Sequence, residues 1–312
     1  MREFNIDFNK TFKPLLIIYA VIFIVGTIFA IVGGVNLDIN FSGGTKISYS
    51  YTGKIAEKDF KAVIDDKLDS SYSLTQSTSL AGDTQTYDVS LVGKNALSAK
   101  DQEALLKALT EKFKDNDVKV YNSNAVSASL AGTFFLKSFV AIVITAILVV
   151  IYVGFRFRRI GGISAALTAL VALVFDVLIV FFTCIFFRLQ IDLNFVAVVL
   201  TMLGYSLNDT IVVYDRVREN ERLNPQMEIG ELVNMSVNKV LIRNIVTTVT
   251  TILAVITIIV VSEIYGLTTL RTFAIPMAFG LVSGSISSVF ISGPLWVIWK
   301  RHQAKKKLAK KA

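Results

Sequence analysis

Cysteine and histidine are almost absent from this sequence of 312 residues, and their scarcity excludes several kinds of chemistry. The single cysteine, Cys184, cannot form a disulfide within the chain or build a cysteine metal cluster. The single histidine, His302, lies in a basic C-terminal segment. Ser–His and Cys–His catalysis inside an apolar segment are therefore excluded, as is a site with several histidine ligands. We expect neither a metal nor a cofactor.

Charged residues are also few. They make up 18% of the chain, whereas hydrophobic residues make up 53% and the mean hydropathy is +0.59. Soluble domains rarely reach such values. A net charge of +8 is compatible with nucleic-acid binding, but the Lys and Arg residues lie between or beside apolar runs, as the positive-inside rule describes. The composition predicts an integral membrane protein without a nucleic-acid partner.

Six apolar runs predict six spanning helices, because each can cross about 30 Å of hydrocarbon at 1.5 Å per residue. The first is longer than the core of a signal peptide and is predicted to remain uncleaved. The predicted domains are an N-terminus with the first helix (1–34), an extracytoplasmic domain (35–131), helices two to six (132–299) and a basic tail (300–312). The six runs are roughly Pro14–Gly34, Phe134–Phe155, Gly162–Phe187, Leu193–Tyr214, Ile242–Val261 and Phe273–Trp299.

Alternate connections between these runs are basic, which predicts the orientation. Arg156, Arg158 and Arg159 separate the second and third runs, a segment rich in Arg (215–239) separates the fourth and fifth, and the basic tail follows the sixth. The opposite loops, 188–192 and 262–272, are short and hold only two Arg and two acids. Both termini are therefore predicted to be cytoplasmic, in a multi-pass protein of the cell membrane. The tail is predicted to contact anionic lipid.

Residues 35–131 have a different composition, with 11 Lys, 13 acids and no Arg. Long translocated domains escape the charge rule, so this segment can lie outside. Its alternating patterns predict the order β-α-β-β-α-β, which is the ferredoxin-like α+β motif. In the second predicted helix, Ser98 is a plausible N-cap. The predicted elements are strand 45–51, helix 55–69, strand 72–79, strand 86–92, helix 98–114 and strand 118–122.

Asp209 lies within the fourth apolar run, where an ionisable group is costly and by default marks an ion path. Low dielectric disfavours the charged form of a carboxyl group, and a nearby cation favours it. A carboxyl balanced between the two effects can load and release a proton near neutral pH. Asn208 beside it supplies a hydrogen-bonding group. The alternative is a structural carboxylate bonded to neighbouring helices.

Arg243 and Thr247 open the fifth run, and Asp176 lies in the middle of the third. Arg243 is predicted to face Asp209, or else to anchor the helix at the headgroups. The hydroxyl group of Thr247 can line a hydrated path or bond its own backbone. Asp176 is a candidate relay group of the same proton pathway, although a structural bond to the fourth helix is the favoured interpretation.

Glycines predict close contacts between helices. Gly280 and Gly284 form a GxxxG pattern in the sixth run, and four nearby serines extend the small face. Gly204 in the fourth run is assigned the same role.

The stretch Gly204–Asn220, GYSLNDTIVVYDRVREN, resembles the SecF family of bacterial protein export. A second segment, Leu37–Thr45, resembles the family's D-F-x-G-G motif through Asp38, Phe41, Gly43 and Gly44, with a longer spacing between its first two residues. The resemblance covers the whole chain. In two places the sequence departs from the family: Phe175 precedes Asp176 where His is common, and the sixth run reads GSISS instead of GTYSS.

This resemblance implies half of an RND-type transporter, which a SecD-like subunit completes. It implies use of the proton-motive force to assist the export of unfolded polypeptide through the SecYEG channel, without enzymatic activity. The family's functional Asp and Arg match Asp209 and Arg243, which are 34 residues apart. Sodium coupling instead of proton coupling remains open.

Three other functions remain possible from the residues alone. One is a free-standing RND-like exporter of small molecules, which needs to dimerise because only six helices are present. Another is an intramembrane aspartyl protease with Asp176 and Asp209 as its carboxyl pair. Against this, the GxGD pattern is missing around the second Asp. The last is a passive membrane-tethered binding module, which has no need of Asp209.

Overall fold

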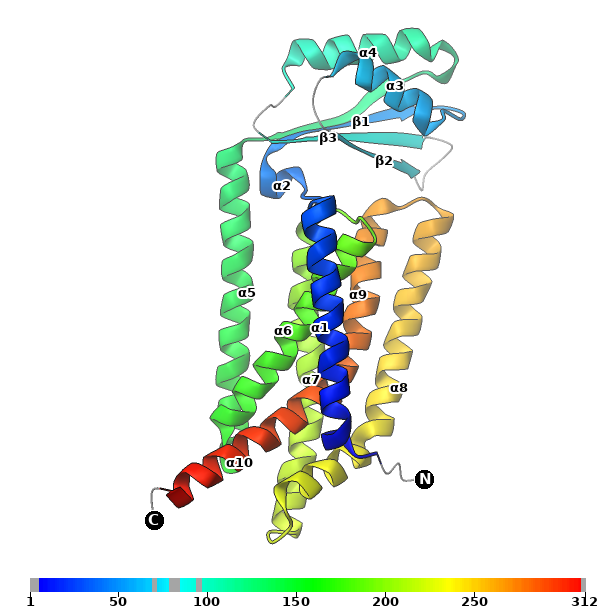
Figure 1. Ribbon diagram of the computed structural model, residues 1–312. Helices are drawn as coiled ribbons and strands as arrows, with labels where there is room; N and C mark the ends of the chain where they lie inside the picture. The colour runs from blue at the N-terminus through cyan, green and yellow to red at the C-terminus, as the bar shows by residue number, and fades with distance from the viewer. Residues whose placement is uncertain (1–5, 69–71, 79–84, 94–96, 310–312) are drawn as a thin grey trace.

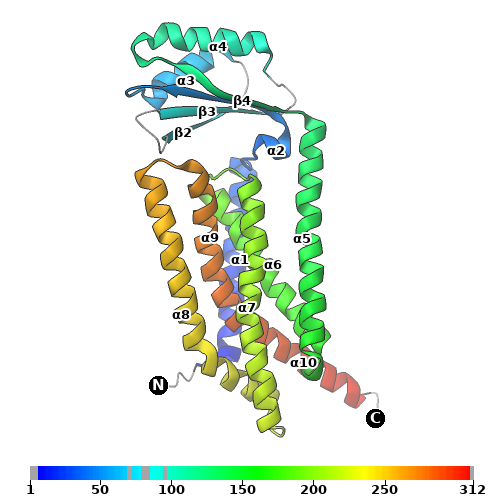
Figure 2. The ribbon, with the colours of Figure 1, turned by 180° about the vertical axis from the view of Figure 1, so that it is seen from behind.

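A computed structural model describes residues 6–68, 72–78, 85–93 and 97–309. It has two parts, a helical bundle and a small α+β domain that lies beyond one end of the bundle (Figure 1). Both chain termini lie at the opposite end of the bundle in both ribbon views (Figures 1 and 2). Among the described residues, six helices are long and apolar enough to cross a membrane. The fold is therefore that of a multi-pass membrane protein with one folded domain outside the bilayer.

The bundle has three central and three peripheral helices. The central helices α6, α7 and α9 are the most buried, whereas α1, α5 and α8 are mostly exposed within this chain. In Figures 1 and 2, α5 and α8 stand at opposite edges of the bundle. The bounds are α1 Phe8–Gly33, α5 Ala128–Arg156, α6 Gly162–Phe186, α7 Leu193–Leu223, α8 Ile229–Ile264, α9 Thr268–Ser287 and α10 Gly293–Ala309, with 3₁₀ turn η2 Arg158–Ile160 and π-helical turn η3 Ser288–Ser292.

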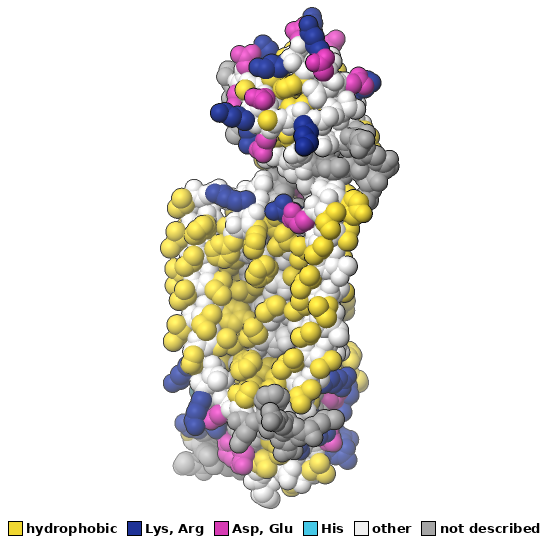
Figure 3. Space-filling model, turned by 90° about the vertical axis from the view of Figure 1, so that its right-hand side faces the viewer, with side chains coloured by type: hydrophobic (Ala, Val, Ile, Leu, Met, Phe, Trp, Pro, Cys, Tyr) yellow, Lys and Arg dark blue, Asp and Glu magenta, His cyan; other side chains and the backbone are white. Residues whose placement is uncertain are grey.

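The surface of the bundle carries a broad apolar band (Figure 3). Lys, Arg, Asp and Glu side chains border this band at the end away from the outer domain, and charged side chains cover the outer domain itself. An apolar band of this kind between charged rims matches the hydrocarbon layer of a bilayer.

The fourth and fifth spanning helices are longer than their apolar runs. The polar segment 215–239 separates these runs, but in the structure it mostly extends α7 to Leu223 and starts α8 at Ile229. Ion pairs three residues apart, Arg216–Glu219 and Arg218–Asp215, stabilise the part of α7 outside the apolar band. The sixth run also differs from the single helix predicted, because η3 interrupts it before α10 begins.

The outer domain has the predicted β-α-β-β-α-β order. Its antiparallel sheet has the strand order β2-β3-β1-β4, which is the ferredoxin-like arrangement. The ends of two predicted elements, Asp69 and Ser79, lie outside the described residues, as do residues 310–312 of the predicted tail. The elements are α2 Ile39–Ser42, β1 Gly44–Tyr51, α3 Glu57–Lys67, β2 Tyr72–Thr78, β3 Gln85–Val92, α4 Ala99–Lys112, η1 Lys114–Asn116 and β4 Lys119–Val126.

One face of this sheet forms an apolar core with α3 and α4. The rings of Phe60 and Tyr87 stack at 4.4 Å, and the side chains of Leu105 and Leu109 are fully buried. Ser98 caps α4 as predicted, because its side chain accepts a hydrogen bond from the backbone N–H of Asp101. The domain is thus a folded unit with its own core, and its only described chain connections to the bundle are through α2 and β4.

Candidate functional site

Asp209 lies on the buried face of α7. Its side chain is only 3% exposed, and its Oδ2 atom is buried without a hydrogen-bond partner among the described residues. The helix is held in place at its start by Asp192, whose carboxylate accepts hydrogen bonds from the backbone N–H groups of Asn194 and Phe195. A buried polar atom without a partner needs an explanation, and water or an ion is the usual one.

The neighbouring helix α8 presents two further buried polar atoms without partners among the described residues, Nδ2 of Asn244 and Oγ1 of Thr248. They are four residues apart and therefore share one face of the helix, which packs against α7 and α9. Together with Asp209, they are three buried polar atoms without partners on two helices that pack against each other. Such a set of groups can hold water or pass a proton along a hydrated path.

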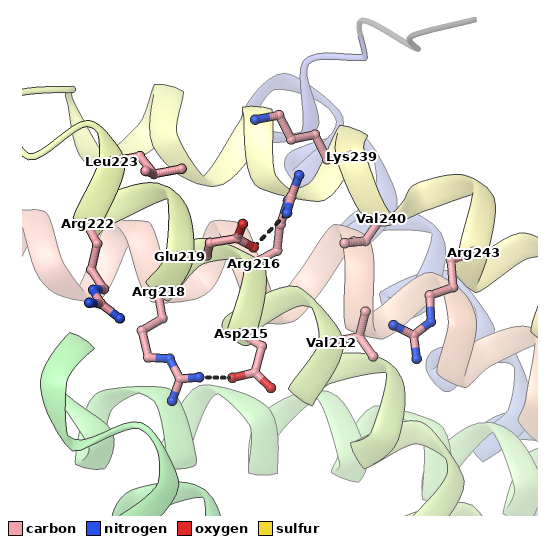
Figure 4. A pocket seen from close by; sticks show the side chains of 10 residues that line it. All are labelled: Val212, Asp215, Arg216, Arg218, Glu219, Arg222, Leu223, Lys239, Val240 and Arg243. Atoms are coloured by element: carbon pink, nitrogen blue, oxygen red, sulfur yellow. Dashed lines mark hydrogen bonds and ion pairs between the residues drawn. The ribbon is translucent and has the colours of Figure 1, made fainter. Parts of the chain in front are cut away.

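Arg243 lies on α8 next to this region. Its charge interacts with the Asp209 carboxyl group, but no hydrogen bond or ion pair within 4 Å joins them in the described part of the chain. Figure 4 shows its guanidinium group pointing toward α7 at Val212, three residues after Asp209. The side chain is exposed and lines a cavity of about 800 Å³ that extends away from the outer domain. Arg243 thus connects the buried carboxyl group to a polar cavity.

Two other residues predicted for the proton pathway lie away from the buried face. Asn208 is exposed on α7, because it precedes Asp209 and points to another side of the helix. Thr247 is also exposed, and its hydroxyl group donates to the backbone carbonyl groups of Arg243 and Asn244. Back-bonding of this kind satisfies a hydroxyl group within its own helix. Among the neighbouring threonines, the buried Thr248 is the better candidate for a place in the proton pathway.

Asp176 on α6 is fully enclosed and hydrogen-bonded. Its carboxylate accepts bonds from Ser206 on α7 at 2.6 Å and from Ser283 and Ser287 on α9 at 2.6 and 2.9 Å. The hydroxyl group of Tyr19 on α1 lies 3.1 Å from that of Ser283, so the network joins four helices. This geometry agrees with the structural role favoured for Asp176. The α9 serines were predicted only as small packing residues, and Tyr19 had no sequence signal.

The glycines of α9 lie at close helix contacts. A Cβ atom added to Gly280 falls 2.8 Å from Val180 Cγ2 on α6, and one added to Gly284 falls 3.0 Å from Ser206 Cβ on α7. Gly204 is different, because it is exposed on α7 and no heavy atom lies within 4 Å of an added Cβ. The predicted packing role of Gly204 is therefore not realised within this chain, because its Cα faces outward.

The segment Leu37–Thr45 attaches the outer domain to the bundle. Asp38 caps α2, and its backbone N–H donates to the carbonyl group of Ile191 in the α6–α7 loop at 3.0 Å. The ring of Phe41 contacts Phe135 on α5. Gly43 and Gly44 have φ values of +76° and +135°, which favour glycine. The motif thus links β1 to α5 and to the start of α7.

Among the described residues, no group of three or more His, Cys, Asp or Glu side chains could hold a metal ion. The polar groups found near the middle of the bundle are instead one carboxyl group with an unpartnered oxygen, one carboxyl group enclosed by serines and one guanidinium group at the edge of a cavity. This arrangement can take up and release a proton or another small cation.

Comparisons with known proteins agree with the fold. The family model described as protein export membrane protein SecD/SecF, C-terminal, matches residues 105–302. The chain is 31% identical over 303 residues to the protein translocase subunit SecF of Petrotoga mobilis, covering 93% of this chain and 95% of the relative. It is 31% identical over 269 residues to the corresponding subunit of Sebaldella termitidis, covering 86% of this chain and 83% of the relative.

Longer relatives match over part of their length. The chain is 30% identical over 310 residues to the protein translocase subunit SecDF of Bacillus subtilis, but it spans only 39% of that protein. A crystal structure of the translocon-associated membrane protein SecDF from Thermus has a TM-score of 0.79 at 25% identity, over 96% of this chain and 39% of that one. The family model and the SecF relatives cover most of the sequence, and this chain therefore belongs to the SecD/SecF family of protein export membrane proteins, in its SecF branch.

Proposed function

We propose that this chain is an accessory subunit of the Sec translocase that uses the proton-motive force to assist protein export. It works with a SecD-like subunit, the SecYEG channel and the exported unfolded polypeptide. The chain spans about two fifths of the relatives that are named SecDF. The rest of those longer proteins has no counterpart in this chain, which supports a separate SecD-like partner. The relatives are translocase subunits and none is named as an enzyme, which supports a role without catalysis.

The observation that carries the coupling proposal is the unpartnered buried oxygen of Asp209 beside the charge of Arg243. Protonation of Asp209 removes its charge and its attraction for the guanidinium group. Arg243 is then held only by the polar cavity that it already lines. One charge that crosses a potential of 100 mV is worth about 2.3 kcal/mol, which can shift a balance between two arrangements of the helices.

A displacement of α7 has a direct route to the outer domain. The helix begins beside Ile191, whose backbone pairs with Asn36 and Asp38 on the segment that leads into α2 and β1. The same helix carries Asp209 lower in the bundle. We infer that a change in how α7 packs around Asp209 moves this connection and tilts the outer domain, which pulls on the exported chain.

The distribution of charge supports cytoplasmic termini. Both termini lie at the end of the bundle opposite the outer domain (Figure 1), and this end carries most of the Arg residues. The positive-inside rule then places the outer domain outside the cell membrane.

Replacement of Asp209 by Asn tests the proposal, because it keeps the shape and removes the titratable group. Translocation into vesicles is measured under a proton gradient and under a sodium gradient. We expect Asp209→Asn to insert normally and to abolish the stimulation by the proton gradient. Thr247→Val is the matched control, since that exposed hydroxyl group bonds only its own backbone in the structure. Unchanged stimulation in Asp209→Asn would contradict the proposal. Stimulation by the sodium gradient alone would show that sodium, and not the proton, is the coupling ion.

The alternative of an aspartyl protease receives no support from the geometry. Such a pair shares a proton between its carboxyl groups. The Asp176 carboxylate instead bonds to three serine hydroxyl groups, and no hydrogen bond joins it to Asp209 within the described residues.

A further inference from the structure

The cavity that Arg243 lines has a strongly basic wall. It measures about 800 Å³ and lies between the polar extension of α7 and the first half of α8 (Figure 4). Two acids and three apolar residues complete the lining, so the side chains give a net charge of +3. The five cations are Arg216, Arg218, Arg222, Lys239 and Arg243.

Both acids of the cavity already have partners. Asp215 forms ion pairs with Arg156 at 3.0 Å and with Arg218 at 2.8 Å, and Glu219 pairs with Arg216 at 2.6 Å. These contacts use two of the five cations in the wall. The positive charge that remains is therefore not neutralised by the acids of the cavity.

Three cations remain for an external partner. The side chains of Arg222 and Arg243 have no hydrogen bond or ion pair within 4 Å among the described residues, and the ammonium group of Lys239 contacts only the neutral Asn220 side chain at 3.3 Å. All three are exposed, and they come from two different helices. Like charges held around one space favour an anion with several oxygens, and a phosphate group fits this requirement.

The position of the cavity indicates a lipid headgroup instead of a dissolved anion. From Arg243 toward the outer domain, the surface of α8 is exposed and apolar: Ile245, Val246 and Val249 are 44%, 55% and 49% exposed. The face of the bundle in Figure 3 carries an apolar band that ends at charged side chains on the side away from the outer domain. A phosphate group in the cavity therefore has a surface for acyl chains directly beside it.

We propose that this cavity binds the phosphate headgroup of an anionic phospholipid, whose acyl chains lie along α8. Arg222 and Lys239 hold the phosphate group, and Arg243 is shared between the lipid and Asp209. The second part rests on the proposed function: a bound phosphate group offers Arg243 a partner outside the bundle and weakens its attraction to Asp209. The lipid would thus bias the same arrangement of α7 and α8 that protonation biases.

The test measures lipid retention by the purified full-length chain. The chain is exchanged into detergent with phosphatidylglycerol or phosphatidylcholine, and bound lipid is counted by native mass spectrometry. Phosphatidylglycerol is expected to bind selectively, and the double variant Arg222→Gln with Lys239→Gln is expected to bind it about 30-fold more weakly, since each basic residue contributes roughly fivefold. The pair Arg222→Lys with Lys239→Arg keeps both charges and should retain binding.

A matched control removes two basic residues elsewhere on the same side, Arg159→Gln with Lys305→Gln, and binding should change less than about threefold. Equal loss in both double variants would overturn the proposal, because it would show attraction to overall charge. Displacement of the lipid by millimolar inorganic phosphate would show a site for free anions. Loss of a co-purified SecD-like subunit with unchanged lipid would show a protein contact. Asp209→Asn should retain the lipid as tightly as the unchanged chain or more tightly, because it removes the carboxylate that competes for Arg243. Failure of the coupling proposal is therefore separable from failure of this one.

Discussion

The Oγ atom of Ser206 on α7 lies 2.6 Å from Oδ2 of Asp176 on α6. Ser206 precedes Asp209 by three residues on the same helix. Three residues of helix correspond to a rise of about 4.5 Å, so this bond fixes the position of Asp209 along the bundle to within one turn. The geometry supports different roles for these two acids: Asp176 positions α7, and in our proposal Asp209 carries the charge that changes.

Asp176→Asn is expected to retain export that depends on the proton gradient. An Asn side chain can accept hydrogen bonds from Ser206 and Ser287 through its oxygen and donate to Ser283 through its amide group. The Ser283 hydroxyl group can then donate to Tyr19, since either hydroxyl group can be the donor in that pair. The measurement is vesicle translocation under a proton gradient, beside Asp209→Asn.

Asp176→Leu supplies the contrast. It leaves three serine hydroxyl groups without their acceptor, and interhelical hydrogen bonds in membranes contribute about 0.6 kcal/mol each, up to about 1.7 kcal/mol. We expect a lower melting temperature in detergent and a parallel loss of export. If Asp176→Asn loses export at an unchanged melting temperature, as Asp209→Asn should, Asp176 carries protons and the assignment of roles is wrong.

Gly44→Ala is expected to destabilise the junction between α2 and β1 by about 3 kcal/mol or more. Its φ of +135° disfavours any side chain, and an added Cβ atom overlaps the backbone carbonyl oxygen of Leu91. Limited proteolysis of the full chain should then cut within the outer domain. Gly132→Ala on α5 is the control, because its added Cβ atom contacts nothing within 4 Å and Ala favours a helix by roughly 0.5–1 kcal/mol. Equal resistance of both variants to protease would contradict this role of Gly44.

Arg243→Lys is expected to keep part of the coupled export, whereas Arg243→Gln should lose most of it. Lysine keeps the charge near Asp209 but lacks the planar group that can bridge from the carboxyl group to the cavity. The rates are measured under proton gradients of different size. If Arg243→Gln exports as well as Arg243→Lys, the charge at this position has no role in coupling.

Hydropathy and charge were sufficient to predict the six spans, because lipid imposes a minimum length and a composition on each. The ferredoxin-like order followed from alternating patterns in strands and from Ser98 as an N-cap. The end of α7 was not predicted, because its polar extension is stabilised by ion pairs such as Arg216–Glu219 and not by apolar periodicity. Hydropathy records where a helix enters lipid, and it does not record how far the helix continues into water.

The site was predicted only in part, for a related reason. Asp209 and Arg243 stand out because charge is costly in a membrane. The hydrogen-bond network around Asp176 draws on three other helices, and serines and a tyrosine are ordinary in spanning segments, so only the packed structure shows that they meet. Thr247 and Thr248 are chemically equal in the sequence. Which of them is buried depends on the rotation of α8 about its axis, and this rotation is set by its neighbours.

Gly204 and Gly284 illustrate the same limit and give the last prediction. Gly284→Leu is expected to lower the melting temperature of the isolated chain strongly, because the new side chain meets Ser206 and Met202 where α9 packs against α7. Gly204→Leu should leave that melting temperature unchanged, since Gly204 is exposed and open space surrounds it within this chain. A glycine on the outward face of a spanning helix permits close approach of another helix. Gly204→Leu should therefore reduce co-purification of a SecD-like subunit, while the exposed Leu253→Ala on α8 should not. Unchanged co-purification with Gly204→Leu would place the partner on another face of the bundle.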